Sequence, residues 1–385
     1  MWRSLASNML TFLIMALFLL VGLILWGQSQ YTATGPLEEA MCLRVDRGSN
    51  MSAVSRDLEE EGAVSDGLIF RLGAEYTEKS QDLKAGSFLI KPGTSMEQIV
   101  DQVTRGGAST CGTEIVYRVG VTRTEAQVRE LDPATDRFIE RAAFDLAEDE
   151  IPEVFTAKLS EPDTRYRIAL AEGVTSWQVV DALKSMDMLA GEVSEIPAEG
   201  MLAPESYEVV AGGERSEILA RMLEVQRLRI NAVWESREEG LPLETPEQML
   251  ILASIIEKET GVPEEREQVS SVFINRLKRG MRLQTDPTVI YGITKGQGVL
   301  GRGLRQSELR GATPWNTYVI EGLPPTPIAN PGRASIEAAL NPDTTPFIFF
   351  VADGTGGHAF ATTLDEHNRN VARWRALEAE QSADN

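Results

Sequence analysis

The sequence predicts an α+β protein with one N-terminal transmembrane helix, and three observations support this fold class. A long apolar run occupies the first thirty residues, and strand-like stretches then alternate with amphipathic helical stretches. From Thr245 onward, a strongly helical segment leads into long Gly- and Pro-rich loops. The chain has 385 residues, 42% of them hydrophobic, which is enough for about two or three packed units.

The formal net charge of −21 excludes one large class of partners. A nucleic-acid-binding surface must be basic to neutralise phosphates, so we expect no nucleic acid partner. The same charge disfavours adhesion to anionic lipid headgroups outside the membrane anchor itself.

The apolar run at residues 10–26 contains no charged residue and is just long enough to cross a hydrocarbon core, so we predict a transmembrane helix at residues 9–27. Arg3 precedes the run, and Glu38 is the first charge after it. The positive-inside tendency therefore places the N-terminus in the cytoplasm and the rest of the chain outside. A cleaved signal peptide is the alternative, but the run is longer than a usual signal core and no small-x-small site follows Trp26.

The only cysteines are Cys42 and Cys111, both on the exported side of the predicted helix. An oxidising periplasm would permit a disulfide that closes a loop of about 70 residues. The sequence supplies no geometry for the two side chains, so it leaves the pairing open.

One local pattern recurs along the middle of the chain: a strand-like stretch, a Gly turn, a small hydroxyl residue and an amphipathic helix. It is clear at Gly93 and Gly173, with weaker copies at Gly48, Gly120 and Gly213. Gly permits the turn and Ser or Thr caps the helix, so we expect βαα- or βααβ-like modules. Residues 129–163 are rich in Asp, Glu and Pro, which favours an acidic insertion or a loosely packed excursion.

A buried helix is predicted after Thr245, which is followed by Pro246 at the first helical position. Its body, residues 249–256, is apolar around nearly its whole circumference, as in helices surrounded by protein. Gly261 stands where a left-handed residue commonly ends a helix.

Two glutamates, Glu257 and Glu259, follow this apolar body on different helical faces, because two residues turn a helix by about 200°. Desolvation would raise the pKa of a carboxyl in such a place, as a general acid requires. The alternative is a structural glutamate paired with Lys258, Arg266 or Arg276. Spacing alone does not choose between the two glutamates.

Several strings in the last 140 residues occur together in one order, and this order carries a resemblance. They are residues 253–260 (ASIIEKET), 272–277 (VFINRL), 282–292 (RLQTDPTVIYG), 314–318 (PWNTY), 322–325 (GLPP), 327–332 (PIANPG), 338–342 (AALNP), 357–360 (GHAF) and 366–368 (EHN). Together they resemble the endolytic murein transglycosylase family (MltG, YceG-like). The earlier part resembles that family more loosely, with a single anchor and LysM-like modules.

The resemblance implies that Glu257 is the catalytic acid and that Glu259 is a neighbouring acidic position. Such an enzyme breaks the β-1,4 bond between N-acetylmuramic acid and N-acetylglucosamine without water. One carboxyl first protonates the leaving oxygen and then accepts the proton of the muramic C6 hydroxyl, which closes a 1,6-anhydro ring. A glycosidase that hydrolyses the bond needs a second carboxylate nearby.

Asp286 is the candidate for such a second carboxylate, unless it only caps the next helix. Amide and hydroxyl side chains can bind the neutral polar groups of a glycan. Each candidate side chain could instead hold a loop in place by hydrogen bonds. The expected substrate-binding residues are Gln284, Thr285, Asp286, Asn316, Tyr318 and Glu259. Trp315 could stack on a sugar ring or fill the core.

No metal site and no cofactor are expected. His358 and His367 are the only histidines, and no His-Glu-x-x-His spacing is present. We expect both histidines to orient the closing loops by hydrogen bonds. Neither cysteine lies near a histidine, and no Gly-x-Ser-x-Gly elbow occurs, which disfavours nucleophilic Ser or Cys chemistry.

The predicted organisation has six parts. They are a cytoplasmic stub (1–8), the transmembrane helix (9–27), a first LysM-like region (28–110), a second LysM-like region with the acidic insertion (111–243), the catalytic domain (244–375) and a flexible tail (376–385). By the resemblance, the protein is a lyase of the cell inner membrane that cuts nascent peptidoglycan in the periplasm and terminates elongation. Its partners are glycan strands and peptidoglycan synthases. The alternatives are a non-catalytic glycan-binding scaffold and a muramidase-type hydrolase.

Overall fold

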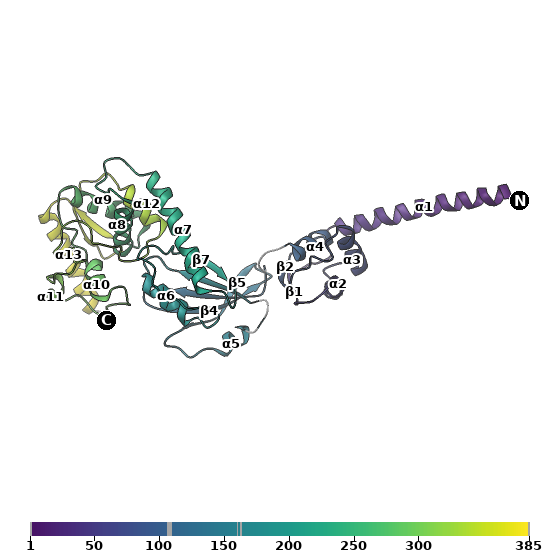
Figure 1. Cartoon of the computed structure of the whole chain (residues 1–385), viewed down its shortest axis with the longest axis horizontal. Helices are drawn as coiled ribbons and strands as arrows, with labels where there is room; N and C mark the ends of the chain where they lie inside the picture. The colour runs from purple at the N-terminus through teal and green to yellow at the C-terminus, as the bar shows by residue number, and fades with distance from the viewer. Residues whose placement is uncertain (1, 106–109, 160, 162–163, 384–385) are drawn as a thin grey trace. The chain divides into compact units, whose positions relative to one another are not determined.

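The computed structural model describes residues 2–105, 110–159, 161 and 164–383 (Figure 1). The chain divides into two compact units. The first contains residues 1–115, 127–144 and 150–165, and the second contains residues 116–126, 145–149 and 166–385. The mixture of helices and strands confirms the predicted α+β class.

The first unit begins with the long helix α1 (Trp2–Thr32). Its segment Met9–Thr32 is long and apolar enough to cross a membrane, and none of its most apolar stretch is buried by protein. This segment starts where the sequence predicted the transmembrane helix, and the helix continues beyond the predicted end at residue 27.

A small α+β module follows α1 in the first unit. Its elements are β1 (Met41–Val45), α2 (Met51–Glu60), α3 (Gly67–Tyr76), β2 (Gly86–Ile90) and α4 (Met96–Thr104). The strands β1 and β2 pair antiparallel, with Met41 opposite Ile90 and Val45 opposite Gly86. The order β1-α2-α3-β2 is the βααβ arrangement that the sequence predicted. Buried Leu58, Phe70 and Ile99 contribute to the module's core.

Cys42 on β1 and Cys111 form a disulfide, with their Cα atoms 5.7 Å apart. The structure therefore answers the question that the sequence left open. The bridge ties β1 to the segment that leads into the large sheet.

The largest sheet has five strands in the order β5-β4-β3-β6-β7. They are β3 (Thr113–Val119), β4 (Thr124–Asp132), β5 (Arg137–Asp145), β6 (Arg165–Leu170) and β7 (Ser206–Val209). Residues 129–163, for which the sequence predicted an acidic insertion or a loosely packed excursion, are regular structure over most of this stretch, which forms part of β4, all of β5 and α5 (Glu153–Leu159). Phe144 and Phe155 are buried and pack edge to face there. The acidic composition of the stretch gave no indication of these buried aromatic residues.

The two clear copies of the recurring pattern are confirmed in detail. Gly93 and Gly173 have φ values of +72° and +81°. Ser95 and Thr175 then form complete capping boxes at the starts of α4 and α6 (Ser176–Ser185). The weaker copy at Gly120 is wrong, because a strand follows it rather than a helix.

The second unit contains a helical core around α8 (Pro246–Glu259). The other elements are α7 (Arg215–Glu235), the 3₁₀ turn η1 (Pro263–Glu265), α9 (Arg266–Lys278), α10 (Asp286–Thr294), α11 (Gln306–Leu309), α12 (Arg333–Leu340), the hairpin β8 (Phe349–Ala352) and β9 (His358–Ala361), and α13 (Leu364–Ala383). Helices α7, α9 and α12 pack against α8, and Met249, Leu252 and Ile255 are completely buried. Because α13 continues to Ala383, most of the predicted tail is helical.

Candidate active site

Helix α8 places Glu257 at the edge of the core of the second unit. The Thr245 hydroxyl accepts the Gln248 N–H at 3.3 Å, which starts the helix, and residues 249–256 are all buried. Glu257 is the first residue after this buried body and is only partly covered. The predicted left-handed cap at Gly261 is wrong, because α8 already ends at Glu259 and Thr260 caps it in an extended conformation.

A loop at residues 327–332 runs along the face of α8 that carries Glu257. The Ser254 hydroxyl accepts the Ile328 N–H at 3.0 Å, and Glu257 Oε2 accepts the Gly332 N–H at 2.8 Å. One turn of helix therefore holds both ends of this loop. The backbone donor at Gly332 fixes the orientation of the Glu257 carboxyl.

Asn330 fastens this loop to two distant segments. Its side chain is completely buried; Oδ1 accepts the Leu202 N–H at 2.9 Å, and Nδ2 donates to the Val174 carbonyl at 3.0 Å. The backbone adds a pair of bonds, from Asn330 N–H to the Val174 carbonyl and from Gly173 N–H to the Asn330 carbonyl. These contacts bring the turn at residues 172–174 to the loop that holds Glu257.

A second carboxyl, that of Glu172, lies beside Glu257 through this arrangement. A Cβ atom added to Gly332 would fall 1.7 Å from Glu172 Oε1, so the Glu172 carboxyl lies directly against the backbone of Gly332. Since Gly332 also donates to Glu257, the nearest oxygens of the two carboxyls lie within about 7 Å of each other. Burial, and then the negative charge of Glu257, raise the pKa of Glu172, while Arg266 opposes the rise.

The structural alternative for Glu257, an ion pair with a nearby base, is not what the structure shows. In the part of the chain that the structure describes, Lys258 Nζ donates to the Gly173 carbonyl at 3.3 Å, and Arg266 lies 3.9 Å from Glu172. Arg276 donates to backbone carbonyls, such as that of Ile348 at 2.6 Å. Burial lowers the pKa of Lys258, whereas the charges of Glu257 and Glu199 raise it. Among the residues that the structure describes, no salt bridge therefore neutralises Glu257.

Glu259 belongs to a different cluster, together with Thr285, Asp286 and Tyr318. The Thr285 hydroxyl donates to the Glu259 carboxylate, and the Tyr318 hydroxyl donates to Asp286 Oδ1 at 2.7 Å. Burial raises the pKa of Glu259, and the charge of Asp286 adds to this rise. Asp286 is the first residue of α10 rather than its cap residue, which is Thr285. The structure thus brings four of the predicted site residues together.

Two other expected sugar ligands have structural partners. Asn316 is completely buried, and its amide donates to the carbonyls of Glu308, Leu309 and Gly311. This geometry favours the loop-fixing role. Gln284 adopts a left-handed backbone with φ of 53°, and its side-chain oxygen lies 3.4 Å from the guanidinium of Arg276.

Trp315 is held by protein rather than presented as an open platform. Its indole N–H donates to the Thr326 hydroxyl at 2.9 Å, and Lys295 Nζ lies 3.5 Å from the ring centroid. Tyr291 packs beside it in a tilted geometry. This environment favours the core-filling alternative over stacking on a sugar ring.

The two histidines contact different partners. His358 Nδ1 lies 2.7 Å from Glu265 Oε2, and its backbone N–H donates to the same carboxylate at 2.8 Å. His367 stacks on the ring of Phe349. Within the described residues, no three His, Cys, Asp or Glu side chains are arranged to hold a metal ion.

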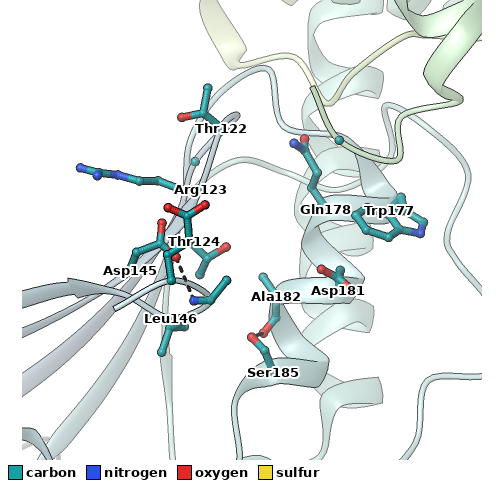
Figure 2. Close-up of a pocket in the computed structure, with 14 residues that line it drawn as sticks. Thr122, Arg123, Thr124, Asp145, Leu146, Trp177, Gln178, Asp181, Ala182 and Ser185 are labelled. Atoms are coloured by element: carbon teal, nitrogen blue, oxygen red, sulfur yellow. Dashed lines mark hydrogen bonds between the residues drawn. The ribbon is translucent and has the colours of Figure 1, made fainter. Parts of the chain in front are cut away.

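A pocket of about 290 Å³ lies elsewhere in the second unit. Figure 2 shows Thr122, Arg123 and Asp145 on one side of it, opposite Gln178 and Asp181 of α6. None of the residues expected at the active site lines this pocket.

The raised pKa of Glu259 predicts a pH dependence of stability. A carboxyl whose pKa is raised in the folded state keeps its proton there after the unfolded chain has lost it, so its contribution makes the protein less stable as pH rises from the ordinary glutamate value to the raised one. We expect Glu259→Gln to remove this contribution. Urea unfolding of both proteins at a series of pH values measures it, and an identical pH slope in the two would contradict the prediction.

This chain is similar in sequence to proteins of one family. The model of the YceG-like family matches residues 43–132 and 113–373. Proteins named endolytic murein transglycosylase match from Streptococcus pneumoniae, at 29% identity over 85% of this chain and 57% of theirs, and from Bacillus subtilis, at 28% over 85% and 82%. The chain thus spans little more than half the length of the pneumococcal relatives. A crystal structure of a YceG-like protein from Listeria monocytogenes aligns with 24% identity and a TM-score of 0.46, covering 86% of this chain and 99% of that one.

Proposed function

Because this chain belongs to the YceG-like family, we propose that it is a membrane-anchored endolytic transglycosylase of peptidoglycan. Its relatives carry that name, and a single apolar helix of sufficient length precedes the folded part. The observation that carries the proposal is the placement of Glu257, which emerges from a buried helix and is oriented by the Gly332 N–H at 2.8 Å.

The proposed reaction needs one carboxyl that first donates and then accepts a proton. Gly332 binds Oε2 of Glu257, which leaves Oε1 to carry the proton that goes to the leaving glycosidic oxygen. The carboxylate that results is stabilised by the same backbone donor. It then takes the proton of the muramic C6 hydroxyl, which attacks the anomeric carbon and closes the 1,6-anhydro ring. The bond between N-acetylmuramic acid and N-acetylglucosamine breaks without consuming water.

The position of Glu172 beside Glu257 favours a second candidate function, a muramidase-type hydrolase. Hydrolases that act on glycosidic bonds use two carboxyls, about 5 to 9.5 Å apart according to the stereochemistry, and Glu172 is a carboxyl that the structure places beside Glu257. Asp286 is less suited to this role, because it partners Tyr318 and adds to the charge around Glu259. We favour the transglycosylase, because the relatives of this chain carry that name and its reaction needs only one carboxyl.

Analysis of the products decides between these functions. We expect the full chain, with uncrosslinked glycan strands, to give 1,6-anhydro-muramic ends by mass spectrometry. Glu172→Gln should give the same ends at a rate reduced by no more than about tenfold, because the proposed reaction needs only the carboxyl of Glu257. Reducing ends from the wild-type protein, lost in Glu172→Gln, would establish the hydrolase. Binding without any cleavage would leave a glycan-binding scaffold.

The remaining assignments follow from this function. We propose that residues 244–375 carry the chemistry, that the LysM-like regions hold glycan, and that the folded part lies in the periplasm beside peptidoglycan synthases. Tyr318, Gln284 and the Glu259 cluster are proposed to contact sugar hydroxyls along the strand. Endolytic cuts in nascent strands would then end their elongation.

A further inference from the structure

Helix α3 of the first unit has an apolar face that no protein covers. Leu68 and Leu72 are 56% and 55% exposed, and Tyr76 is 89% exposed. These residues are spaced four apart, so they form one stripe along the helix. The opposite side of α3 packs into the core of the module through Phe70 and Ala74, both completely buried.

This stripe, Leu68, Leu72 and Tyr76, carries no charge. The partly buried Ile69 flanks it on one side, and the exposed Glu75, three residues from Leu72 and seven from Leu68, flanks it on the other. Arg71 lies further round the helix, where it donates to the Ser52 hydroxyl of α2 at 3.1 Å. The helix thus has a core side and an exposed apolar stripe that one acidic residue borders.

The position of α3 indicates what covers the stripe. Tyr31, in the last turn of α1, is buried, and its ring lies directly on Gly73 of α3, where an added Cβ would come within 2.1 Å of it. The apolar segment Met9–Thr32 ends at this contact. Figure 1 shows α3 on the side of the module from which α1 emerges. A bilayer crossed by α1 would therefore begin within a few residues of α3.

We propose that the stripe on α3 rests in the interfacial region of the bilayer and holds the first unit against the membrane surface. Leucine enters the edge of the hydrocarbon, and tyrosine is enriched where hydrocarbon meets headgroups. The contact is apolar, so the net charge of −21 does not oppose it in the way that it opposes adhesion to anionic headgroups. The proposal rests on the membrane anchoring by α1 that forms part of the proposed function.

The disulfide makes a specific test possible. Since Cys42 and Cys111 are paired, a cysteine introduced by Leu72→Cys is the one free thiol and can carry an environment-sensitive NBD dye. The full chain is placed in nanodiscs of zwitterionic lipid, with or without a lipid quencher whose spin label lies near the headgroups. We expect quenching of the dye at position 72 to exceed that at a control position by at least about twofold, with little effect of salt.

The matched control is Leu228→Cys, because Leu228 of α7 in the second unit is exposed to nearly the same extent, 54%. A label from Tyr76→Cys should behave like that at position 72. Quenching no greater at positions 72 and 76 than at 228 would overturn the inference. Failure of the labelled chain to enter nanodiscs at all would instead contradict the anchoring by α1, so the two failures are distinguishable.

Discussion

Replacing Glu257 with Gln is expected to abolish glycan cleavage, with a loss of at least about a thousandfold in rate. Glutamine keeps the size of the side chain and its contact with the Gly332 N–H, but it can neither donate nor accept the proton that the reaction moves. The release of anhydro-muramic ends from purified glycan strands measures the effect. Because the side chain is only partly covered, the thermal midpoint should change by no more than a few degrees.

The control for this variant is Glu264→Gln. Glu264 is an exposed glutamate of η1, seven residues further along the chain, so its replacement removes the same charge from the same region. We expect its activity to equal that of the wild-type protein. Residual activity of Glu257→Gln above about a tenth of the wild-type rate would refute the assignment of Glu257 as the acid, whatever the products are.

The second large effect is expected from Asn330→Ala. This change leaves the Leu202 N–H without its partner in a completely buried place and removes a donor from the Val174 carbonyl. We expect the free energy of unfolding to fall by about 3 kcal/mol, as for other broken buried polar networks. Activity should fall as well, because the loop that orients Glu257 and the turn that carries Glu172 lose the side-chain hydrogen bonds that connect them.

Asn341→Ala is the matched control for this second variant. Asn341 is partly buried, and its amide donates to the Glu337 carbonyl at the end of α12. We expect a loss below about 1 kcal/mol in urea unfolding and unchanged activity. An equal loss in the free energy of unfolding in both variants would show that the hydrogen bonds of Asn330 stabilise the protein no more than that of Asn341.

The elements that depend on neighbouring residues were predictable from the sequence. The apolar run before Gln28 is continuous, and a helix that can cross a membrane occupies it. The turns at Gly93 and Gly173 and the caps that follow them depend on contacts only a few residues apart. The buried body of α8 was predictable because its apolar residues cover the whole circumference. Where composition was used in place of periodicity, at residues 129–163, the prediction failed.

Which carboxyls lie together depends on contacts between segments that are far apart in the sequence. Glu257 and Glu259 are two residues apart, yet one faces Gly332 and Glu172 while the other is enclosed by Thr285 and Asp286. Glu172 is 85 residues before Glu257, and no local pattern predicts that a loop held by Asn330 will bring it there. The helix that presents Glu257 was predictable from residues 245–259 alone, because helix formation and burial follow from local apolar spacing. The partner of that carboxyl depends on hydrogen bonds between distant segments, which form only when the chain is packed.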